Sequence, residues 1–175
     1  SFLLYPKMIT DISGEEYVTY LQKYFYKPIG ATTLGFTPKK NNFTNNIVPT
    51  EIDSFWRKSL TKNWVHDENA ALMGGISGNA GLFGSALDLA KMMQMYCNYG
   101  YYDMKQYISE RTVKEFTKIQ FPQNGNRRGL GFDKPLIGND TLPIHKAYPA
   151  PEVSKESFGH SGFTGTFVWA DPTHE

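Results

Sequence analysis

The chain has 175 residues, of which 40% are hydrophobic and 20% charged, and a formal net charge of +1. These values are ordinary for a soluble globular domain with a hydrophobic core, and the near-zero charge gives no electrostatic basis for binding nucleic acid or an anionic membrane. The single cysteine, Cys97, excludes an internal disulfide and a thiolate metal cluster.

The segment 2–28 predicts two helices. Apolar residues recur at helical spacing over 2–12, where Pro6 is tolerated in a first turn. In the stretch that follows, Ser13 and Glu16 have the spacing of a capping box. No apolar stretch is long enough to span a bilayer, and the opening residues lack the basic start and the cleavage site of a signal peptide.

Residues 30–63 are polar and turn-rich, so we expect a long irregular connection there. Glycines then precede a helix that Ser85 would cap and Gly100 would end. Its expected buried face consists of Leu89, Met92, Met93 and Tyr96. A further short helix is expected from Ser109, and strands are expected over 126–138 and 163–171.

Three groups of side chains upstream are candidates for chemistry. Ser59 and Lys62 have the spacing of a serine nucleophile and its lysine, but the stretch around them is polar and basic, which indicates a chance match. Consecutive residues point in different directions, so the run His66–Asp67–Glu68 is a weak metal site, and we expect its side chains to hydrogen-bond the following loop. A metal hydrolase using these three residues remains a third hypothesis, which stoichiometric zinc would support. Cys97 is interpreted as a buried structural thiol.

The stretch "FGHSGFTGTFVWADP", residues 158–172, places three glycines around His160 and Ser161 and then continues into a β-branched, aromatic run. A small-residue strand beside a histidine and a serine suggests an enzyme cleft. Taken alone, the pattern favours a strand with a surface histidine over an enzyme cleft. Ser161 also lacks the Gly-x-Ser-x-Gly pattern of a nucleophile elbow.

Four segments in order resemble the serine β-lactamase and penicillin-binding-protein superfamily, in its class C-like and esterase branch. They are "SGEEYVTYLQKYFYKPIGATTLGF", "VHDENA", "GGISGNAGLFGSALDLAKMM" and "GHSGFTGTFVWADP". The resemblance implies an α+β fold, a helical region plus part of an antiparallel sheet. It also implies one partial domain over residues 1–175, without the family's Ser-x-x-Lys and Tyr-x-Asn region and without its last strand and helix.

The last of these segments resembles the family's third motif, where Lys-Thr-Gly is often replaced by His-(Thr/Ser)-Gly. The resemblance implies catalytic roles for His160, Ser161 and Phe163, with the backbone N–H of Phe163 forming half of an oxyanion hole. It implies substrate contacts at Gly162, where a substrate would pair with the strand edge, and at Thr164. Histidine instead of lysine weakens a fixed positive charge at neutral pH, which favours esterase or peptidase specificity. No metal and no cofactor is implied.

We therefore expect part of a serine acyl hydrolase that acts through an acyl-enzyme on a small-molecule or peptide acyl substrate. The resemblance places such a protein in the periplasm or another extracytoplasmic compartment. The chain alone is expected to be inactive, because its nucleophile would lie upstream. The alternative is a non-catalytic module that binds peptidoglycan-like peptides or glycans. Association through the exposed edge of the strand over residues 166–171, which would lack its next partner, is also expected.

Overall fold

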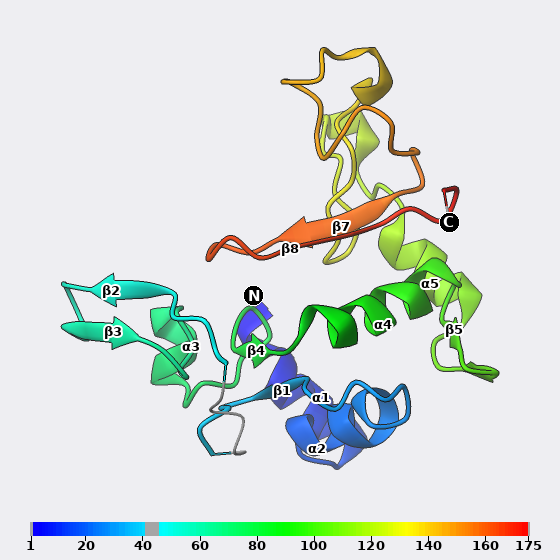
Figure 1. Cartoon of the computed structure of the whole chain (residues 1–175). Helices are drawn as coiled ribbons and strands as arrows, with labels where there is room; N and C mark the ends of the chain where they lie inside the picture. Colours follow the sequence, from blue (N-terminus) through cyan, green and yellow to red (C-terminus); the bar gives the residue numbers. More distant parts are fainter. Residues whose placement is uncertain (1, 41–45, 175) are drawn as a thin grey trace. The chain divides into compact units, whose positions relative to one another are not determined.

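A computed structural model describes residues 2–40 and 46–174 (Figure 1). It divides into two compact units, Ser1–Leu89 and Ala90–Glu175, which are described separately. Short helices and small two-stranded antiparallel sheets make up both, as expected of an α+β chain. Within the described ranges, no helix combines the length and the apolar character needed to cross a bilayer.

The first unit begins with the 3₁₀ turn η1 (Phe2–Leu4) and helix α1 (Tyr5–Ser13), and Pro6 lies in the first turn of α1 as predicted. Helix α2 (Tyr17–Leu21) continues into the π-helix η2 (Gln22–Tyr26). The predicted capping box is wrong. The Ser13 hydroxyl donates back to the carbonyl of Ile9 (2.6 Å), and Glu16 itself is the N-cap of α2, accepting from the N–H groups of its first turn.

The core of this unit is apolar and lies around strand β1 (Gly35–Phe36), which pairs antiparallel with β4 (Leu82–Phe83). Asp88, in the first turn of α4 (Ala86–Cys97), is buried and accepts hydrogen bonds from the N–H and the hydroxyl of Thr33, both at 2.7 Å. These bonds fix the start of α4 against the loop before β1. The buried apolar residues are Tyr26, Ile29, Ala31, Leu34, Phe36, Val65 and Ala70.

The connection expected to be irregular contains a hairpin of β2 (Glu51–Asp53) and β3 (Ser59–Thr61). Its loop is held by the Asp53 carboxylate, which accepts the N–H groups of Phe55, Trp56 and Arg57 at 2.9 Å each. These bonds, with burial opposing them, lower the pKa of Asp53 to about 2. The Arg57 guanidinium donates to the carbonyls of Val65 (3.0 Å) and His66 (2.8 Å), just before helix α3 (Glu68–Leu72). The hairpin is thereby joined to the start of α3.

The second unit contains the end of α4, the two-stranded pair β5 (Tyr101–Tyr102) and β6 (Lys105–Gln106), and helix α5 (Glu110–Thr117). Ser109 caps α5 as predicted, accepting from the N–H of Thr112 (3.1 Å). On α4, Met95 is fully buried, whereas the four residues predicted to form the buried face are only half-buried. The prediction therefore misplaced the centre of the packed face by about one residue. The 3₁₀ turns η3 (Pro122–Asn124) and η4 (Asn139–Thr141) precede the hairpin of β7 (Phe158–Ser161) and β8 (Phe167–Ala170).

The strand predicted over 126–138 is wrong for most of its length. This segment is irregular and touches the sheet at one position, where Asp133 forms a bridge with Gly159 of β7. A turn interrupts it, since the N–H of Gly129 donates to the carbonyl of Phe132 (3.0 Å), and Gly131 has a φ of +80°. The aromatic rings of Phe132 and Phe158 meet edge to face, with centroids 5.1 Å apart. The segment therefore contacts β7 through the backbone of Asp133 and the ring of Phe132.

Candidate functional site

The residues that the sequence singled out lie together at the end of one hairpin. His160 and Ser161 are the last residues of β7, paired with Val168 and Phe167 of β8. The connecting turn is closed by hydrogen bonds from the N–H of Gly162 to the carbonyl of Thr166 (2.7 Å) and from that of Gly165 to the carbonyl of Gly162 (3.0 Å). The predicted residues His160, Ser161, Gly162, Phe163 and Thr164 are all exposed.

One edge of β7 is oriented by its bridge to Asp133. Gly159 donates its N–H to the Asp133 carbonyl (3.1 Å) and accepts from the Asp133 N–H (2.7 Å). Alternate residues of an antiparallel strand direct their backbone groups to the same edge. The N–H and carbonyl of Ser161 therefore point to the edge on which Gly159 meets Asp133. That edge is the one where an extended ligand would have to pair with the end of β7.

The glycines of the motif do different things. At Gly159, an added Cβ would overlap the carbonyl oxygen of Val168 and the ring of Trp169. Glycine at this position therefore lets the partner strand β8 lie close to β7. At Gly162, an added Cβ would meet the hydroxyl of Thr166, which a side-chain rotation can move. Gly165 has a φ of +85°, which glycine adopts without strain. Gly159 is thus required by the sheet.

A network of charged groups lies beside the exposed histidine. An Nη1 atom of Arg128 lies 3.3 Å from Nε2 of His160, and Nδ1 of His160 lies 2.7 Å from the carbonyl oxygen of Ser161. A guanidinium can only donate and a carbonyl can only accept, so Nε2 is the acceptor and Nδ1 carries the proton. Arg128 in turn lies near the buried carboxylate of Asp133 (3.8 Å), which Arg127 also pairs with. Sequence reasoning missed Arg128, which is 32 positions from its histidine partner.

Two more ionisable groups anchor the hairpin. Lys134 is buried and donates to the carbonyl of Glu156 (2.8 Å), and burial lowers its pKa to about 8. Asp171, just after β8, accepts from the N–H (2.7 Å) and the hydroxyl (2.6 Å) of Ser154. Burial acts to raise the pKa of Asp171, and its hydrogen bonds from Ser154, His174 and Thr173 outweigh that effect and hold the pKa below its usual range. Both groups fix the chain that leads into and out of the hairpin.

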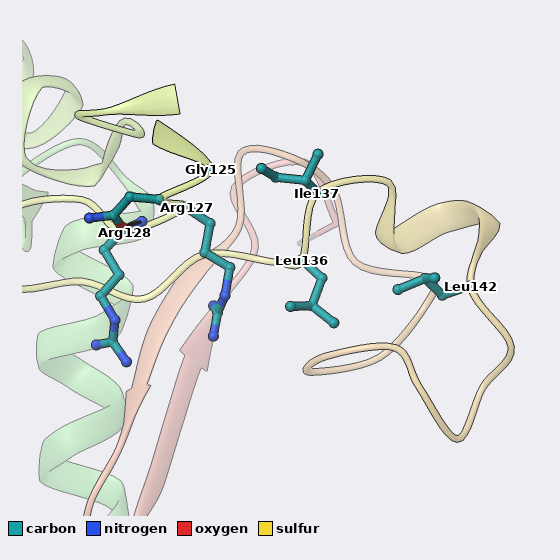
Figure 2. Close-up of a pocket in the computed structure, with 7 residues that line it drawn as sticks. Gly125, Arg127, Arg128, Leu136, Ile137 and Leu142 are labelled. Atoms are coloured by element: carbon teal, nitrogen blue, oxygen red, sulfur yellow. Dashed lines mark hydrogen bonds between the residues drawn. The ribbon is translucent and has the colours of Figure 1, made fainter. Parts of the chain in front are cut away.

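A hollow of about 470 Å³ adjoins this network (Figure 2). Its residues come from two segments, 125–128 and 136–142. One contributes the guanidinium groups of Arg127 and Arg128, and the other contributes apolar side chains. The lining of the hollow thus combines two arginines with three aliphatic residues, Leu136, Ile137 and Leu142.

The other candidates have structural partners. Ser59 is on strand β3, so Lys62 does not follow it by one turn of a helix. His66 pairs with Glu51 (2.9 Å), and Asp67 is the N-cap of α3, accepting from the N–H of Ala70 (2.7 Å). Over residues 2–40 and 46–174, no three histidine, cysteine or acidic side chains are grouped as a metal ion requires. Cys97 is half-buried, less than predicted.

Comparison with known proteins identifies relatives over almost the whole chain. The sequence matches the protein family described as Beta-lactamase over residues 4–175. A protein of Escherichia coli O157:H7 named "Putative D-alanyl-D-alanine carboxypeptidase" is 32% identical over 186 residues, which cover 99% of this chain and 41% of the relative. The chain thus spans about two fifths of the length of the curated relatives it matches.

Two solved structures share the fold. A penicillin-binding protein homologue from Pyrococcus abyssi, described as octameric, superimposes with a TM-score of 0.65 at 22% identity, covering 98% of this chain and 34% of that one. A penicillin-binding protein homologue from Caulobacter crescentus gives a TM-score of 0.61 at 20% identity, covering 96% of this chain and 47% of that one. The family match, which extends from residue 4 to residue 175, shows that the chain belongs to the β-lactamase family.

Proposed function

We propose that the protein is a serine acyl hydrolase in which the end of β7 and the following turn form one wall of the substrate cleft. The observation that carries the proposal is the exposure, on one strand end and one turn, of the five residues that resemble the family's third motif. His160, Ser161 and Phe163 are the proposed catalytic residues. Gly162 and Thr164 are the proposed substrate contacts.

The proposed reaction is acyl transfer through a serine ester. The serine oxygen would bond to the substrate carbonyl carbon while its proton passes through a neighbouring base to the departing group, whose bond to that carbon breaks. Water would then split the ester, returning the serine hydroxyl and releasing a carboxylic acid. The N–H of Phe163 would stabilise the oxyanion formed in both steps.

The nucleophile itself is proposed to lie outside these 175 residues. The sequence contains one Ser-x-x-Lys, at Ser59–Lys62, and its serine is on a strand instead of a helix. Because this geometry does not bring an amine beside the hydroxyl, we propose that the chain on its own forms no acyl-enzyme. That the 175 residues form one domain stays a prediction.

The name of the Escherichia coli relative supports a substrate class. We propose that the substrate is a peptide ending in D-alanyl-D-alanine, and that the protein acts in the cell envelope, where such peptides occur. Association through the outer edge of β8 also stays a prediction. In the part of the chain that the structure describes, β8 pairs with β7 and with no other strand.

Intact-mass spectrometry after incubation with a β-lactam and with a fluorophosphonate tests the proposal. The chain would be compared with a longer form that carries the family's helical Ser-x-x-Lys, and with that longer form after serine-to-alanine substitution. We expect one covalent adduct on the longer form alone. An adduct on the 175-residue chain would contradict the proposed location of the nucleophile. If no form gave an adduct, the hydrolase proposal would be rejected, and a module that binds peptidoglycan-like peptides or glycans would be favoured.

A further inference from the structure

The β2–β3 hairpin directs its polar face inward and its apolar face outward. Alternate residues of a strand point to opposite faces, and the cross-strand pair of Ile52 and Leu60 lies on the face opposite Asp53. Asp53 is buried, whereas Ile52 is 79% exposed and Leu60 is 53% exposed. A sheet with one covered face usually covers the apolar one, so this hairpin presents to solvent the face that is normally packed.

The loop of the hairpin adds two exposed aromatic rings. Phe55 is 92% exposed and Trp56 is 44% exposed. Their backbone N–H groups donate to the Asp53 carboxylate at 2.9 Å each, so the loop is held through its backbone while both rings remain accessible. One hairpin thus carries four exposed apolar residues, which we call the hairpin apolar surface: Ile52, Phe55, Trp56 and Leu60.

Positive charge accompanies this surface. Residues 54–64 contain three basic and no acidic side chains. The two acidic residues of the hairpin, Glu51 and Asp53, share the opposite face, and each is engaged in an ion pair there. Lys58 and Lys62 are exposed on either side of β3, and neither has an ion-pair partner in the part of the chain that the structure describes. The near-zero net charge of the whole chain therefore conceals a local excess of positive charge.

We propose that this hairpin is a docking surface for an anionic lipid bilayer. The inference goes beyond the proposed function and does not depend on acyl chemistry. Aromatic and aliphatic side chains enter the boundary between headgroups and acyl chains, and lysines beside them contact lipid phosphates. Charge complementarity favours an anionic bilayer over a second copy of the chain, because the second copy carries the same unpaired lysines.

Co-sedimentation of the full chain with lipid vesicles tests this inference. Vesicles of phosphatidylcholine alone are compared with vesicles of phosphatidylcholine and phosphatidylglycerol in equal parts. One variant, Phe55→Ser, removes the most exposed ring of the hairpin. A second variant combines Lys58→Gln with Lys62→Gln and removes its unpaired charge. Far-UV circular dichroism would confirm that each variant is folded.

The matched controls make the same chemical changes in the second unit. Met104→Ser removes an apolar side chain that is 87% exposed between β5 and β6. The combination of Lys146→Gln with Lys155→Gln removes two exposed lysines and leaves the same net charge as the double substitution in the hairpin. Any difference between a hairpin variant and its control therefore reports the position of the change.

We expect the native chain to bind the anionic vesicles at least tenfold more tightly than the neutral ones. Each hairpin variant should lose about tenfold in affinity for the anionic vesicles, and each control should stay within about twofold of the native chain. Equal binding to both kinds of vesicle, or equal losses in hairpin variants and controls, would overturn the inference.

Sedimentation velocity of the free chain separates the bilayer from a second copy. A dimer that Phe55→Ser dissociates would overturn the inference, because the hairpin apolar surface would then be covered by another copy of the chain. A native chain and a Phe55→Ser variant that are both monomeric would support the bilayer as the partner. The acyl adduct is measured separately, so the failure of either proposal would leave the other in place.

Discussion

Strand β7 has two halves that differ in what fixes them. Phe158 and Gly159 are buried, and their surroundings are an aromatic cluster, the partner strand β8 and the bridge to Asp133. His160 and Ser161 are exposed and are held by polar contacts with each other and with Arg128. Packing thus determines the first half, and the second half is available for chemistry. Substitutions in the two halves should therefore affect different properties.

The largest expected contrast is between two phenylalanines. Phe158 is 1% exposed and Phe163 in the turn is 95% exposed. Phe158→Ala should lower the free energy of unfolding by about 3–5 kcal/mol, because it removes a buried ring and leaves a cavity. Phe163→Ala should change it by less than about 0.5 kcal/mol. Urea unfolding of both variants measures the contrast, and similar losses would contradict the division of the hairpin.

Alanine substitutions at two glycines should show a smaller difference in stability, again with the larger loss in the buried half of β7. Gly159→Ala should cost about 3 kcal/mol, because the new methyl group overlaps the backbone of Val168 and the ring of Trp169. Gly162→Ala should cost about 1 kcal/mol or less, since the Thr166 hydroxyl can rotate away. Thermal unfolding at one pH compares them. If Gly162→Ala were the more damaging change, the turn would be more tightly packed than the strand.

The smallest expected effect is a pH dependence in the buried half, where Lys134 lies over the ring of Phe158 at 6.0 Å. Its pKa of about 8 in the folded chain is below the ordinary value of 10.5, so the unfolded chain binds more protons between these pH values. Stability should therefore rise with pH across this window, by on the order of 1–3 kcal/mol.

The control is Lys134→Met, which keeps an unbranched side chain one atom shorter and removes the charge. The difference in unfolding free energy between the native chain and this variant isolates Lys134 from the tyrosines that also titrate at alkaline pH. We expect the variant to be at least as stable at pH 7, and its advantage to shrink toward pH 10. A constant difference in unfolding free energy from pH 7 to pH 10 would show that the charged form of Lys134 does not destabilise the folded chain.

Local signals in the sequence predicted local structure well. Ser109 caps α5, and Pro6 lies in the first turn of α1, because each depends on residues within one helical turn. The capping box failed because Ser13 has a second possible acceptor, the carbonyl of Ile9 in the preceding helix. The hairpin β2–β3 was missed because its loop is held by the Asp53 side chain and lacks the glycines that mark tight turns.

The candidate site was predicted only along one strand. The motif around His160 is contiguous, so sequence reasoning could identify its residues and expect them together. The strand predicted over 126–138 was wrong because Asp133 is fixed by ion pairs with two arginines, and glycines interrupt the segment. Arg128 could not be predicted to reach His160, since no spacing rule relates residues from an irregular segment and a strand.

The Arg57 contacts have a consequence for how the first unit opens. Hydrogen bonds from the loop of the β2–β3 hairpin reach the carbonyls of Val65 and His66, immediately before α3. Opening the loop breaks these bonds and exposes three amides that Asp53 holds, although the side chain of Phe55 in this loop is 92% exposed. The hairpin and the start of α3 should therefore exchange their amide hydrogens as one cooperative unit, with slow exchange in a loop that carries the exposed side chain of Phe55.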